Sequence, residues 1–203
     1  MRLTIGRCLI VATVLAVLPH SALAQVHILG SGGFRAALTE ALPGFERATG
    51  IAVTTSAGSS QGTGSNRIST QLERGELADV VVMSREGLDE LVAAGRIVPG
   101  SVVDLAQVPI GVGVRSGAPK PDIRTVEAFR QMLVEAKSVT FQSTTGIYLT
   151  TTLFPQLGIA DLIARKSTDG GPPAVARGDV EVALQPVSEL VHAPGVDYVG
   201  PLR

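Results

Sequence analysis

Cysteine and aromatic residues are scarce in this sequence, and their scarcity narrows the chemistry open to it. Of the 203 residues one is Cys, none is Trp, and aromatic residues make up 3%. The single cysteine, Cys8, lies in an N-terminal segment that we expect to be removed, so the rest of the chain can form no disulfide and no thiolate metal site. His27 and His192 are isolated and lack the spacing of zinc ligands. We therefore predict neither a metal nor a cofactor.

A long apolar run is missing after residue 24. The first 24 residues hold Arg2 and Arg7, an apolar run from Leu9 to Leu18, and the tripeptide Ala22-Leu23-Ala24. This three-part pattern is typical of a cleavable secretory signal. Ten apolar residues are too few to span a bilayer, which needs about 20. We expect a signal peptide over residues 1–24, a periplasmic location, and no membrane-spanning segment after cleavage.

An excess of positive charge is missing too. Beyond residue 24 there remain 15 of the 17 Lys and Arg residues against 18 acidic residues, which gives a formal net charge of −3. No long basic run occurs, and aromatic residues are too sparse to form a stacking platform for bases. The sequence therefore predicts no basic surface that could bind nucleic acid or an anionic membrane.

What is present is an alternation of short apolar runs and helical stretches. This order is typical of an α/β fold with helices packed on a parallel sheet. A turn-rich passage near residues 99–107 suggests a boundary between a first lobe, 25–104, and a second, 105–203. Predicted strands cover 26–29, 51–55, 80–83, 108–114, 138–141, 179–184 and 196–199; predicted helices cover 34–49, with a kink or break near Pro43, 67–74, 85–94, 126–136, 146–157 and 187–191.

Uncharged polar residues collect in three loops that follow predicted strands. These loops are 30–33, 57–66 and 142–146, and no residue from Thr54 to Asn66 is charged. In open α/β sheets ligands bind beyond the carboxyl ends of strands. Hydroxyls, glycine backbone and helix N-termini can together hold an anion without Lys or Arg. Each loop alone could also be a solvated turn, but three at equivalent positions favour an anion site.

Two catalytic motifs occur in incomplete form. The run Gly58-Ser59-Ser60-Gln61-Gly62 fits the G-x-S-x-G pattern of serine hydrolases. That chemistry needs a histidine base, and neither His27 nor His192 stands in a suitable place. The segment Gly30-Ser31-Gly32 lacks the third glycine of a dinucleotide-binding loop, because position 35 is Arg. No catalytic residue is predicted from these patterns.

The ordered segments resemble the periplasmic molybdate-binding proteins of ABC transporters. The resemblance rests on VHILGSGGFRAALTEALPGFERATGIAVTTSAGSS (26–60), TQLERGELADVVVMS (70–84), TTGIYLTTTLFPQLGIAD (144–161) and RGDVEVALQPVSEL (177–190). It implies a type II periplasmic binding fold, in which two α/β lobes close on a small anion, and a transporter permease as partner. The ligand-binding residues that it implies, together with the polar loops, are Ser31, Gly32, Gly33, Ser59, Ser60, Thr144, Thr145, Gly146 and Gln185.

The chain departs from this family at several points. Gly33 stands where the family has a serine, and Gln185-Pro186 where it has a tyrosine. The passage 167–177 looks short, and with it the helix that would supply another amide. The resemblance further implies a C-terminally truncated chain, in which a returning strand and a last helix are missing after Arg203. We would then expect a loose hinge and an exposed apolar patch.

Three functions remain open at this stage. The first is a non-enzymatic, substrate-binding component of an ABC transporter that binds a small oxyanion such as molybdate. The second is an isomerase of a small carboxylate on the same fold, similar to aconitate isomerase, which needs a general base. The uncharged loops offer no clear base, which favours the first. The third is a decayed paralogue that binds nothing.

Overall fold

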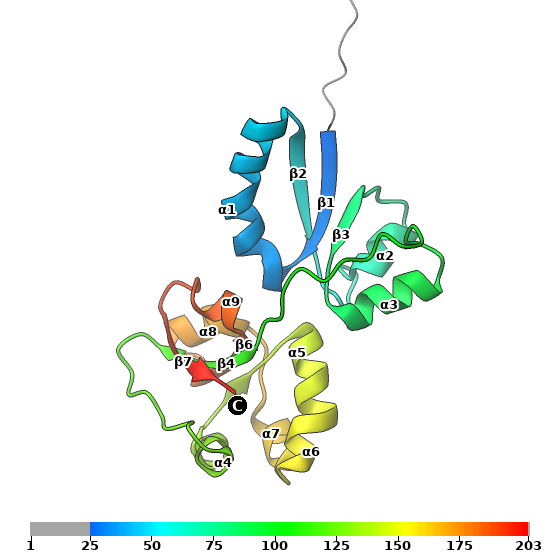
Figure 1. The fold of residues 1–203 in the computed structure, drawn as a ribbon. Helices are drawn as coiled ribbons and strands as arrows, with labels where there is room; N and C mark the ends of the chain where they lie inside the picture. The colour runs from blue at the N-terminus through cyan, green and yellow to red at the C-terminus, as the bar shows by residue number, and fades with distance from the viewer. Residues whose placement is uncertain (1–24, 203) are drawn as a thin grey trace, which may run out of the picture.

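The computed structural model describes residues 25–202, which form two α/β lobes stacked one above the other (Figure 1). The predicted signal peptide lies outside the described residues. The first lobe contains a three-stranded sheet and the second a four-stranded sheet. None of the described helices is both long and apolar enough to cross a membrane.

The first lobe is built on a parallel sheet with the strand order β2-β1-β3. Its core is small and centres on Leu29, Ile68 and Leu91, which are almost fully buried. Because the strands run parallel, their carboxyl ends open at one edge, where Ser31 pairs with Gly58. Its elements are β1 (Gln25–Ser31), α1 (Gly32–Thr49), β2 (Ala52–Gly58), α2 (Ile68–Glu73), β3 (Val80–Val82) and α3 (Arg85–Ala93).

The second lobe contains a mixed sheet with the order β5-β6-β4-β7, in which β4 runs antiparallel to β6 and β7. The main core lies here, around Leu133, Leu149, Phe154 and Leu184. Its elements are β4 (Ile110–Arg115), α4 (Val126–Glu135), β5 (Val139–Thr140), α5 (Ser143–Tyr148), the π-helical segment η1 (Leu149–Leu153), α6 (Phe154–Gln156), α7 (Ala160–Lys166), α8 (Gly171–Arg177), β6 (Val182–Pro186), α9 (Val187–Leu190) and β7 (Val196–Pro201).

The structure corrects several sequence-based boundaries. Helix α1 continues through Pro43 without a break; Pro43 is exposed, so water can bond the carbonyl that its missing N–H leaves free. Helix α8 lies in the passage 167–177, which we expected to be short, and it has seven residues. Strand β6 begins at Val182 instead of Asp179, because the N–H groups of Asp179 and Val180 bond to the Ala174 carbonyl and finish α8.

Two regions bring the lobes together. Residues 96–109 contain no helix or strand and lead from α3 to β4; the expected boundary at residue 104 falls within this segment and stays a prediction. Arg85 of α3 forms an ion pair with Asp104 in it. On the other side the first turn of α1 contacts α9 (Figure 1). A cavity opens between these two regions.

Candidate functional site

The cavity between the lobes has a volume of about 610 Å³ and is lined by residues of both. Pockets for small organic ligands occupy about 300–1,000 Å³. Eight of the nine expected ligand-binding residues line it, from the ends of β1, β2 and β6 and the starts of α1 and α5. Their role in binding stays a prediction. The eight are Ser31, Gly32, Gly33, Ser59, Ser60, Thr144, Thr145 and Gln185.

Hydrogen bonds from α2 and from the start of α3 hold the loop after β2, which forms the cavity wall of the first lobe. Ser60 is 5% exposed, and its Oγ accepts a hydrogen bond from the Ser84 N–H at 2.9 Å. Gln71 donates from Nε2 to the Asn66 carbonyl at 2.7 Å. Gly87 on α3 is needed here, because a Cβ would lie 2.4 Å from the Ser60 carbonyl oxygen. The Ser60 hydroxyl thus has a structural partner and retains one hydrogen that it can donate.

The wall from the second lobe holds polar atoms that have no partner. The Thr144 Oγ1 and Gln185 Nε2 atoms are buried without a hydrogen-bond partner in the described part of the chain, although both residues line the cavity. Gln185 is 2% exposed and Thr145 8%. A buried donor without a partner costs about 1–3 kcal/mol. These two atoms are candidates for hydrogen bonds to a bound ligand.

Gly146 is the expected residue that does not line the cavity. It lies inside α5, where its N–H bonds to the Gln142 carbonyl at 3.1 Å. A Cβ added there would lie 3.2 Å from Cδ2 of Phe141, so the residue faces the core. The close packing of Phe141 against Gly146 therefore explains why this position is glycine.

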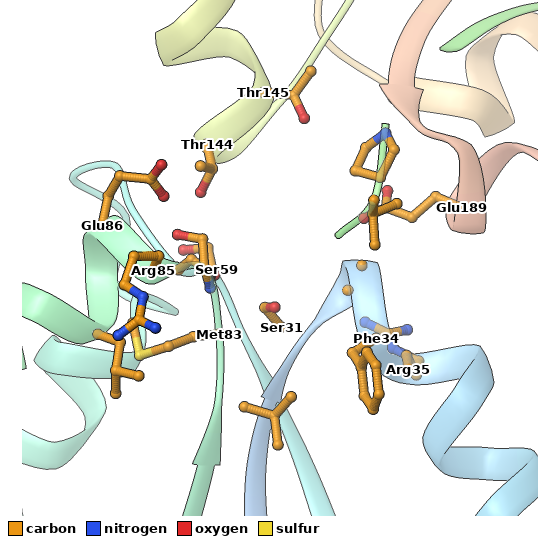
Figure 2. A pocket seen from close by; sticks show the side chains of 18 of the residues that line it. Ser31, Phe34, Arg35, Ser59, Met83, Arg85, Glu86, Thr144, Thr145 and Glu189 are labelled. Carbon is orange, nitrogen blue, oxygen red and sulfur yellow. Dashed lines mark hydrogen bonds between the residues drawn. The ribbon is translucent and has the colours of Figure 1, made fainter. Parts of the chain in front are cut away.

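Charged side chains also line the cavity, and none of them was predicted as a site residue from the sequence. Glu189 follows β6 on α9 and faces the first turn of α1; Arg35 comes from α1, and Arg85 and Glu86 come from the start of α3 (Figure 2). Carboxyl groups therefore line the cleft, although the sequence offered no clear base. Its position in the sequence could have predicted Glu189 as a site residue, because the run Gln185-Pro186-Val187-Ser188-Glu189 also follows the carboxyl end of a predicted strand.

The surroundings of Glu189 change the pKa of its carboxyl group in two opposite ways. Burial raises the pKa of its half-buried carboxyl above the ordinary value, and the positive charge of Arg35 opposes that rise. Its Oε1 lies close to Gly32, since a Cβ added to Gly32 would be 3.0 Å from it. A carboxyl group with a raised pKa in a cleft is a candidate for exchanging protons with a ligand.

The serine hydrolase motif lacks its partner in the structure. Neither His27 nor His192 lines the cavity that holds Ser60. The His27 ring lies on the first sheet and is engaged by Thr54 Oγ1 and Ser56 Oγ, each at 2.9 Å. His192 is exposed after α9. The G-x-S-x-G run therefore shapes a loop whose serine contacts the N-terminus of α3.

Replacing Gln185 with methionine should raise thermal stability and weaken ligand binding together. Methionine has a similar shape and removes the unpartnered amide, so the free energy of unfolding should rise by about 1–3 kcal/mol. Loss of a hydrogen bond to a charged ligand should lower affinity about 10- to 150-fold. Thermal melting and calorimetry measure the two effects. A variant that is less stable and binds normally would mean that Gln185 serves packing.

Comparison with known proteins identifies the family of this chain. The family model described as bacterial extracellular solute-binding protein matches residues 26–203. A Pseudomonas sp. protein named aconitate isomerase is 39% identical over 98% of this chain and 77% of its own length. This relative contradicts our expectation that the chain is not an enzyme.

Solved structures share the fold at low sequence identity. The Azotobacter vinelandii periplasmic molybdate-binding protein aligns with a TM-score of 0.63 at 17% identity, over 86% of this chain and 76% of that one. The substrate-binding domain of a putative molybdenum ABC transporter from Clostridium difficile gives 0.62 at 14%, over 89% and 79%. These likenesses confirm the periplasmic binding fold with two α/β lobes and do not establish the ligand. The chain belongs to the bacterial extracellular solute-binding protein family.

Proposed function

We propose that this protein is an isomerase that moves a proton between two carbons of a small polycarboxylate such as aconitate, with Glu189 as the general base. The observation that carries the proposal is a half-buried carboxyl group in a cleft otherwise suited to anions. Repulsion from Glu189 opposes any anionic ligand, aconitate included, so the positive charges of Arg35 and Arg85 have to offset it. Abstraction of a proton nevertheless requires such a carboxylate, whereas anion capture has no use for it.

The chemistry can be balanced with this chain's residues alone. Aconitate is propene-1,2,3-tricarboxylate, with a methylene group beside its double bond. The Glu189 carboxylate would take one methylene proton, and the electron pair would spread over the three-carbon unit and its carboxylates. Protonated Glu189 would then return the proton to the carbon at the other end. The former double bond becomes a single bond, and the bond from the central carbon to the former methylene carbon becomes the new double bond. The conformation about that bond when the proton leaves decides whether the product is cis or trans, so the isomers interconvert without a cofactor.

The remaining cleft residues fit a substrate with several carboxylates. Arg35 and Arg85 would supply positive charge at two positions, and Arg35 lies beside Glu189. Gln185 Nε2 and Thr144 Oγ1 offer buried polar atoms that can hydrogen-bond a carboxylate on which negative charge accumulates. Preorganised donors of this kind stabilise such charge without reorganisation. The relative named aconitate isomerase supports this choice of substrate.

The second candidate is capture of a small anion for an ABC transporter permease. It is favoured by the family, by the fold, and by the uncharged loops, and it fits a periplasmic protein released by cleavage after residue 24. Molybdate is the ligand named for the Azotobacter vinelandii neighbour, and its capture would give the Glu189 carboxyl group no role.

The experiment is to incubate residues 25–203 with cis-aconitate or trans-aconitate in D₂O and follow both by proton NMR. We expect either isomer to yield the same mixture, with deuterium entering the receiving carbon in each turnover in which Glu189 exchanges its proton with solvent before returning it. Melting curves with molybdate and tungstate run in parallel, because a ligand at 100 times its Kd should stabilise the protein by about 2.7 kcal/mol. No turnover together with such a shift would support anion capture and reject the isomerase.

A further inference from the structure

A single side-chain hydrogen bond joins the two lobes within residues 25–202. Ser188 donates from Oγ to the Gly33 carbonyl at 2.6 Å, across 155 positions of sequence. Ser188 lies on α9, a helix of four residues that follows β6 directly, and Gly33 lies in the first turn of α1. Because α9 is so short, a shift of Ser188 also moves its neighbour Glu189.

Two adjacent glycines open α1, and they have different surroundings. A Cβ on Gly32 would meet Glu189 Oε1 at 3.0 Å and Cδ at 3.6 Å, whereas a Cβ on Gly33 would meet nothing within 4 Å. The first distance is tighter than ordinary van der Waals contact, so the carboxyl group would have to move by a few tenths of an ångström. The Glu189 carboxyl can therefore come this close to α1 because Gly32 lacks a side chain.

We propose that this joint between α1 and α9 assembles the base: Ser188 holds α9 on α1, Gly32 admits the Glu189 carboxyl, and Glu189 is in place only while the lobes are together. The inference rests on the proposed function. Ser188 and Gly32 are positioning residues that act through Glu189. When the lobes separate, Glu189 loses the cover of α1 and becomes exposed to water, and it moves away from Arg35.

The pair Gly32→Ala and Gly44→Ala tests the joint with matched changes in one helix. Both substitutions add one methyl group to α1, but only the first meets Glu189; a Cβ on Gly44 would lie 3.9 Å from Arg47 Nη2, and Gly44 does not line the cavity. We expect Gly32→Ala to lower kcat about 10-fold or more, because small misplacements of reacting groups are costly. Gly44→Ala should stay within about 2-fold of the wild type, because it displaces no reacting group. Equal activity of the two variants would overturn the role of Gly32.

Ser188 is tested by Ser188→Ala and by Ser188→Thr, which keeps the hydroxyl group. Ser188→Ala should lower kcat, raise the radius of gyration in X-ray scattering, and bring the pKa of Glu189 down toward its ordinary value, since burial is what raises it. Ser188→Thr should restore all three. Carbon-13 NMR of labelled glutamate carboxyl groups, with Glu189→Gln to assign the signal, measures this pKa.

The two proposals fail in different ways. If the wild type does not interconvert aconitate isomers, the proposed function fails, but scattering and NMR still test the joint. If the wild type is active and Ser188→Ala matches it in kcat, radius of gyration and Glu189 titration, the joint is overturned and the function stands.

Discussion

Replacing Glu189 with glutamine should lower kcat for aconitate isomerisation by about 10²–10⁴-fold, the usual contribution of a general base. Glutamine keeps the shape of the side chain but cannot accept the proton. Binding should persist or tighten, because one negative charge leaves a cleft that holds an anion. Steady-state kinetics and calorimetry with the slow variant separate the two effects.

Glu86 supplies the matched control for this substitution. It lines the same cavity from the first turn of α3, but it is exposed (Figure 2). Glu86→Gln should change kcat by no more than about 3-fold, since an exposed carboxyl group is a poorly placed base. If Glu86→Gln abolished turnover while Glu189→Gln retained it, the base would be assigned to the wrong helix.

Replacing Arg35 with methionine should lower kcat/KM about 10- to 150-fold, the range expected when a charge-assisted hydrogen bond to a carboxylate is lost. It should also move the pH profile. The Arg35 charge favours ionised Glu189, so its removal should raise the pKa of Glu189 further. Because the base must be ionised to act, the acidic limb of kcat/KM should shift to higher pH.

Arg35→Lys separates charge from shape. Lysine keeps the positive charge, so the acidic limb should stay near its wild-type position even where affinity falls. The rate is measured across the pH range with each variant under saturating and limiting substrate. An acidic limb that does not move in Arg35→Met would show that another group sets the profile.

Local patterns were sufficient to predict most of the first lobe. Apolar runs gave β1, β2 and β3, and the glycine-rich loops after β1 and β2 gave the edge where the cavity opens, since strand period and turn residues are local signals. Helix α8 was missed because Gly170-Gly171-Pro172-Pro173 resembles a loop. Proline is tolerated in the first turn of a helix, where its missing N–H has no partner to lose.

The charged part of the site depends on contacts distant in sequence. Glu189 is half-buried because α9 meets the first turn of α1, about 155 residues earlier in the chain. Nothing within VSEL distinguishes it from a glutamate on a solvated turn. The loops were recognised because they carry no charge. That pattern predicts neutral donors and excludes charged residues such as Glu189 and Arg35.

Helix α1 has no fully buried residue along its 18 positions, whereas the shorter α4 buries Phe129, Met132 and Leu133. A helix with so little covered surface opens locally at a low free energy. Its first turn, however, is tied to the second lobe through Gly33. Lobe closure on a ligand would thus raise the local unfolding free energy of α1 as far as Thr49, so a substrate that meets only Gly32, Gly33 and Arg35 would protect the whole helix.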